Sequence, residues 1–181
     1  MTRRGPGGTL LVLLLWAAAC SSGDDTVAPE AWAGAVCGAV GSWQEDLGSA
    51  TSDLQGQAAA ATDPAALRDA LVASLAASSA RTDRLLDELA GAGTPSGEGG
   101  EDLAGEVRAR VEEARRLFET ARTEAEGLPG DDAGAVGRGA ADIDRALREG
   151  SGAVAAPLGG TAGSPAREAL RDEAGCGGLA G

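Results

Sequence analysis

Histidine, lysine, tyrosine and asparagine are absent from this sequence of 181 residues, and each absence excludes some chemistry. Without histidine there is no Ser-His-Asp or Cys-His catalytic group and no imidazole ligand for a metal. Without lysine there is no Schiff-base residue and no P-loop lysine. Bases are also scarce, since 15 arginines stand against 28 acids and the net charge is −13. Binding to nucleic acid needs a basic surface, so we expect no nucleic-acid partner.

The first 19 residues have the pattern of a secretory signal peptide. Arg3 and Arg4 give a positive start, and an apolar run follows from Thr9 to Ala19 with small residues at its end. A membrane-spanning helix needs about 20 apolar residues, and this run is too short for one. Arg3-Arg4 also allows twin-arginine export, although Gly5-Pro6-Gly7 follows in place of that signal's hydrophobic residues.

Two interpretations of signal cleavage stay open. Ala17 and Ala19 fit the small-x-small pattern of ordinary secretion. The same stretch with Cys20 directly after it resembles the lipobox of bacterial lipoproteins, with Ala17 in place of the usual leucine. The resemblance implies that Cys20 receives diacylglycerol and becomes the mature N-terminus, and that its two acyl chains anchor the protein on the extracytoplasmic face of the cell membrane. Residues 20–29 then form a flexible tether.

The number of cysteines agrees with lipidation. An odd cysteine in an exported protein needs an explanation, and this chain has three. Lipidation of Cys20 leaves Cys37 and Cys176 as a pair, which an oxidising compartment would join in a disulfide. The alternative is two free buried thiols.

The composition of the mature chain warns of disorder, because large apolar residues are few and removal of residues 1–19 brings the net charge to −15. Periodicity favours folding instead. Residues 30–61 carry apolar side chains at alternating steps of four and three, as an amphipathic helix does: Val36, Val40, Trp43, Leu47, Ala50 and Leu54.

Three further long helices follow. Asp63 and Pro64 are suited to the N-cap and first turn of the second, which ends at the glycine-rich segment from Gly91. The third spans about residues 101–126, and Asp131 or Asp132 caps the fourth. Residues 151–163 are rich in glycine, alanine and proline and are expected to be a linker, and Ser164-Pro165 begins a short fifth helix that ends near Gly175.

No segment shows the alternation of a strand. The sequence therefore predicts an all-α fold, an up-down bundle of four main helices plus a short C-terminal helix, stapled by one disulfide. Residues 30–181 would form this single domain.

Candidate catalytic groups are restricted to carboxylates. Asp24-Asp25, Asp131-Asp132, Glu112-Glu113 and the cluster Glu98, Glu101 and Asp102 lack the spacing of a calcium loop, and we interpret them as solvated charge. Two acids alone can hydrolyse glycosides, but aromatic platforms for a sugar are almost absent. Residues 91–100 are glycine-rich without the other landmarks of a phosphate loop. We expect no catalytic residue, no metal and no cofactor.

The two tryptophans of the mature chain differ in their expected roles. Trp43 lies on the apolar seam of the first helix and belongs to the core. Trp32 either covers one end of the bundle or offers an exposed aromatic side chain to a partner.

The segment Trp32-Ala-Gly-Ala-Val-Cys37-Gly, then Trp43, and the closing Cys176-Gly-Gly-Leu179 resemble a broad class of small actinobacterial lipoproteins, helical and exported. That resemblance implies location and fold, and no activity. We expect a non-enzymatic interaction or structural module that could favour basic protein partners. The alternative is a carrier or sensor that holds a small apolar ligand between its helices.

Overall fold

The computed structural model describes residues 26–154, 163–173 and 176, and its described part is almost entirely helical. The elements are β1 (Thr26–Val27), α1 (Pro29–Ala60), α2 (Pro64–Gly91), β2 (Thr94–Pro95), α3 (Gly100–Glu126), α4 (Ala133–Val154) and α5 (Pro165–Asp172). The predicted all-α bundle of four main helices and a short fifth one is confirmed.

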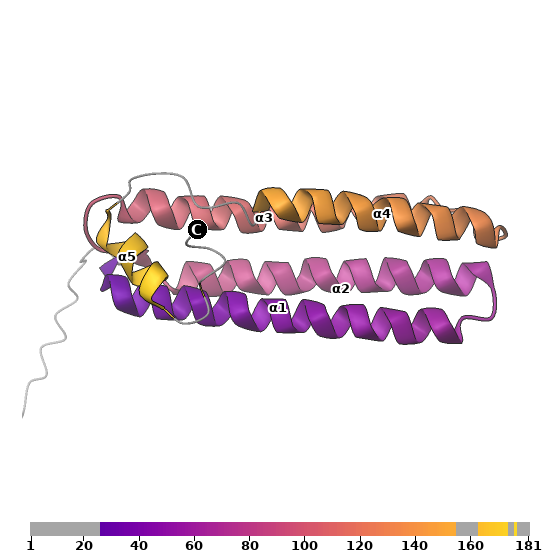
Figure 1. Ribbon diagram of the computed structural model, residues 1–181, viewed down its shortest axis with the longest axis horizontal. Coiled ribbons are helices and arrows are strands. Elements are labelled where there is room, and N and C mark those ends of the chain that lie inside the picture. Colours follow the sequence, from indigo (N-terminus) through magenta and orange to yellow (C-terminus); the bar gives the residue numbers. More distant parts are fainter. Residues whose placement is uncertain (1–25, 155–162, 174–175, 177–181) are drawn as a thin grey trace, which may run out of the picture.

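The long helices lie side by side and alternate in direction (Figure 1). α2 is the central helix, since it packs against both α1 and α3 along their lengths. α4 turns back along α3, whereas α5 packs mainly against α1 at the opposite end. We call the end with α5 the bridged end, and the end where α1 joins α2 and α3 joins α4 the far end.

Side-chain caps mark where α2, α4 and α5 begin. The Asp63 carboxylate accepts a hydrogen bond from the amide of Ala66 at 2.8 Å, and Pro64 occupies the first turn of α2. Asp132, one of the two candidates for the fourth helix, accepts from the amide of Ala135 at 2.9 Å. The Ser164 hydroxyl caps α5 in the same way.

The core has two apolar clusters, one at each end of the bundle. The bridged cluster is the larger, and its buried members are Trp32, Ala33, Val36, Cys37, Val40, Leu85, Leu89, Leu103, Val107, Val111, Ala166, Ala169, Leu170 and Cys176. The far cluster has only five buried members, which are Leu71, Leu75, Ala121, Ala125 and Ile143. Because buried apolar area is the main source of stability, the bridged end is the better stabilised half.

Small and polar residues of α2 lie between the two clusters along the chain. Ser78, Ser79 and Thr82 are buried, although they carry hydroxyl groups. Ser78 and Thr82 satisfy these groups on their own helix, since each hydroxyl donates to the carbonyl oxygen four residues earlier. We call these three residues the hydroxyl band.

Three boundaries differ from the sequence prediction. Thr26 and Val27 were assigned to the tether, but they form β1, which pairs in parallel with β2. The predicted linker at 151–163 was wrong in its first four residues, because α4 continues to Val154. α5 stops at Asp172, before the predicted end near Gly175. A pair of two-residue strands is too short to produce an alternating pattern, which explains why the first difference had no signal in the sequence.

Candidate functional site

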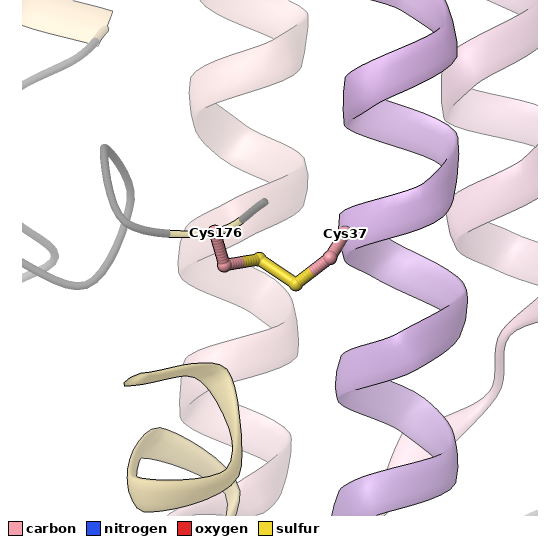
Figure 2. The surroundings of a disulfide bond; sticks show 2 residues. All are labelled: Cys37 and Cys176. Atoms are coloured by element: carbon pink, nitrogen blue, oxygen red, sulfur yellow. A yellow bond between two sulfur atoms is a disulfide. The ribbon is translucent and has the colours of Figure 1, made fainter. Parts of the chain in front are cut away.

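The cysteine pair lies at the bridged end. Cys37 is in the third turn of α1, Cys176 follows α5, and a disulfide joins them (Figure 2). The Cα atoms are 5.4 Å apart, within the usual range for a disulfide. Both residues are buried, with 5% and 0% of their surface exposed. The bridge closes a loop of 139 residues and holds the end of the described chain against α1, as the sequence analysis expects. Cys20, the predicted lipidation site, lies outside the described residues.

The segment that leads from Cys20 into the domain is attached at the same end. Thr26 pairs with Thr94 and Val27 with Pro95, and the amide of Ser96 donates to the Val27 carbonyl oxygen at 2.8 Å. The loop between α2 and α3 therefore fixes the place where the chain enters the bundle. Gly100 is needed here because a Cβ atom on it would run into the backbone carbonyl of Pro95.

A buried arginine also ties α5 to α3. Arg167 is only 7% exposed, and its guanidinium lies 3.8 Å from the carboxylate of Glu106. The same carboxylate accepts a hydrogen bond from Arg110 at 3.0 Å. Removing one member of such a group leaves a buried charge without compensation, so these residues fix the position of α5 relative to α3. The sequence carries no signal of this contact, because nothing in the spacing relates residue 167 to residue 106.

The carboxylate groups named from the sequence do not converge. Glu98, Glu101 and Asp102 are exposed on the loop before α3 and in its first turn, at the bridged end, whereas Asp131 and Asp132 are exposed at the far end. Glu113 forms an ion pair with Arg116 at 2.6 Å on the outer side of α3. Asp24 and Asp25 lie outside the described residues. Within residues 26–154, 163–173 and 176, no group of three or more possible metal ligands occurs.

The structure decides between the two interpretations of Trp32. Its side chain is 2% exposed and belongs to the bridged cluster, so the expectation of an exposed aromatic side chain is wrong. Trp43 packs against the same cluster but stays half-buried, and its indole Nε1 donates to Thr82 Oγ1 at 3.1 Å. Phe118 packs against the far cluster instead. The two half-buried aromatic side chains thus belong to different parts of the core.

No helix in the described part of the chain is both long and apolar enough to cross a bilayer. The chain matches no protein-family model, no curated protein and no solved structure.

Proposed function

We propose that this protein is an exported lipoprotein, anchored to the cell membrane through Cys20, whose acidic helical bundle is a non-enzymatic interaction or structural module on the extracytoplasmic face. The observation that carries the proposal is the pairing of the cysteines. The structure joins Cys37 to Cys176, which leaves Cys20 as the odd one of three, directly after a signal-like apolar run. A disulfide at this position also fits an oxidising compartment.

The distribution of charge on the described residues supports the proposal that the bundle is an interaction module. Their carboxylates are spread over both ends and the outer faces of the helices, and most of their arginines form ion pairs with acids on the same or a neighbouring helix. A surface with excess negative charge favours basic partners by steering them toward it. Because Trp43 and Phe118 pack against separate clusters, they do not line one ligand site, and this observation favours the interaction module over the carrier for an apolar ligand.

The anchor is tested with the full-length protein expressed in a host that lipidates exported proteins. The unaltered chain is expected in the membrane fraction, with a mass that shows acylation of Cys20. Cys20→Ala should appear in the medium, because the substitution removes the residue that would carry the acyl chains. Ser21→Ala is the matched control and should remain in the membrane fraction. An unmodified Cys20 thiol, or a Cys20→Ala protein that stays with the membrane, would show that the anchor hypothesis is wrong.

A further inference from the structure

The structure bears on how the proposed lipoprotein is oriented relative to the membrane, because the chain enters the bundle at one end of an elongated domain. β1 lies beside the loop that connects α2 to α3, and α1 begins two residues later at the same end (Figure 1). Only five residues lie between Cys20 and Thr26, and the six residue steps span about 20 Å at full extension. An anchor at Cys20 therefore keeps the bridged end close to the membrane.

The bundle is long compared with that span. α1 has 32 residues, which at 1.5 Å per residue amounts to about 48 Å. α2 runs beside it with 28 residues, so the α1–α2 connection at the far end lies about 50 Å from the point of entry. The tether alone would still allow this rod to tip over and lie along the bilayer, and the distribution of charge decides between the two orientations.

The surface around the entry point is acidic. The first turn of α1, the last turn of α2 and the loop and first turn of α3 contain no arginine, and their exposed acids are Glu30, Asp87, Glu88, Glu98, Glu101 and Asp102. α5 beside them carries two acids, Glu168 and Asp172, together with Arg171 and the buried Arg167 that faces Glu106, and Glu173 follows directly after it. An anionic leaflet repels such a surface at distances up to about one Debye length, which is near 8 Å at physiological salt.

Along the described sides of the bundle, most arginines are paired with acids, so these sides attract an anionic surface only weakly. Arg84 lies 3.5 Å from Asp46 on the neighbouring helix, and Arg115 lies 3.3 Å from Asp83 in the same manner. On α4, Arg145 and Arg148 pair with acids one turn earlier. A helix that adheres to an anionic bilayer carries bases along its polar face, and in these four ion pairs an acid offsets the charge of each arginine.

From these observations we propose that the protein stands on the membrane: its bridged end faces the bilayer without adhering to it, and the far end projects outward by roughly the length of α1. This inference rests on the proposed lipid anchor. It assigns the membrane-facing surface to β1, the loop at 92–99 and α5, and it leaves the α1–α2 and α3–α4 connections as the parts most remote from the lipid.

Energy transfer from single labels to acceptor dyes in the bilayer tests the orientation. The full-length lipidated protein is placed in vesicles that contain an anionic phospholipid, with Ser96→Cys labelled at the bridged end or Thr62→Cys labelled at the far end. Both positions are exposed and lie outside the helices. The new thiol is the one that reacts, because the chain has three cysteines, two of them are joined and buried, and the lipid occupies the third.

We expect strong transfer from Ser96→Cys and loss of most of it from Thr62→Cys. Equal transfer from the two labels means that the rod lies flat, and stronger transfer from Thr62→Cys means that it is inverted; either result overturns the proposal. In vesicles of neutral lipid, energy transfer from the label at Thr62→Cys should rise, since electrostatic repulsion no longer keeps the bundle away from the bilayer. Unchanged energy transfer would overturn the claim that charge sets the orientation. Failure of the anchor is seen separately, as an unacylated protein that does not stay with the vesicles.

Discussion

Removing the Cys37–Cys176 bridge should lower the stability of the whole bundle. In the chain-entropy treatment, cross-linking residues 139 positions apart restricts the unfolded chain by about 5 kcal/mol at 25 °C, an upper figure because native strain and residual structure reduce it. Typical domains have a free energy of unfolding of about 5–15 kcal/mol. For a bundle whose far cluster has five buried members, the bridge is therefore expected to supply a large share of the total.

The double variant Cys37→Ala/Cys176→Ala tests this directly, in a chain that begins at residue 21 so that no third thiol interferes. Urea unfolding is followed by helical circular dichroism and, separately, by the fluorescence of Trp32 and Trp43, which both report on the bridged cluster. With a slope of about 2 kcal/mol per molar urea, a loss of 5 kcal/mol moves the midpoint by about 2.5 M. The bridged protein, measured with and without reductant, is the control, and the reduced form should match the variant.

Two results would refute the reasoning. A midpoint that moves by less than about 0.5 M, which corresponds to about 1 kcal/mol, means that the bridge does not constrain the unfolded chain as assumed. A tryptophan signal that changes in a separate, earlier transition while the helical signal is retained means that the bridge only holds α5 in place.

Four further predictions concern packing. Trp32→Ala should cost about 3–5 kcal/mol in urea unfolding, because it empties the centre of the bridged cluster, and a cost below 1 kcal/mol would contradict the burial. Trp43→Phe removes the donor to Thr82 and should cost about 1 kcal/mol more in the unaltered chain than in a Thr82→Val background, where only the packing of the ring is lost. Gly48→Ala should stabilise α1 by about 1 kcal/mol, since the added Cβ meets open space, whereas Gly100→Ala should destabilise the protein. A change in the free energy of unfolding with the same sign for both variants would be inconsistent with the structure. Amide hydrogen exchange should be faster around the far cluster than around the bridged cluster, and equal protection would show that the smaller cluster is no weaker.

Much of the fold follows from the sequence because its signals are local. The cap and proline at Asp63-Pro64 and at Ser164-Pro165 mark two helix starts, and the structure has both. The seam from Val36 to Leu54 predicts the buried side of α1, where Val40 and Ala50 are buried and Trp43 is half-buried. Such patterns depend on residues three or four apart, which the sequence shows directly.

The parts that escaped prediction depend on contacts between distant residues. The pairing of β1 with β2 needs Thr26 to meet Thr94, and the ion pair of Arg167 with Glu106 joins two helices that no periodicity relates. Trp32 is buried in a cluster that also includes residues of α1, α2, α3 and α5, which are far apart in the sequence. The sequence also left the end of α4 open, because the glycine and alanine of residues 151–154 occur both in linkers and in helix ends.

The hydroxyl band of α2 has a consequence for how this molecule can vary in length. Along α2, the buried apolar residues of the bridged cluster lie on one side of the hydroxyl band, and those of the far cluster lie on the other. Whole helical turns could therefore be added to or deleted from the α1–α2 and α3–α4 hairpins on the far side without altering the disulfide, α5 or β1. Every seven residues inserted in each paired helix would lengthen it by about 10 Å while keeping the apolar seam in register. The same bridged end could thus support bundles of different length.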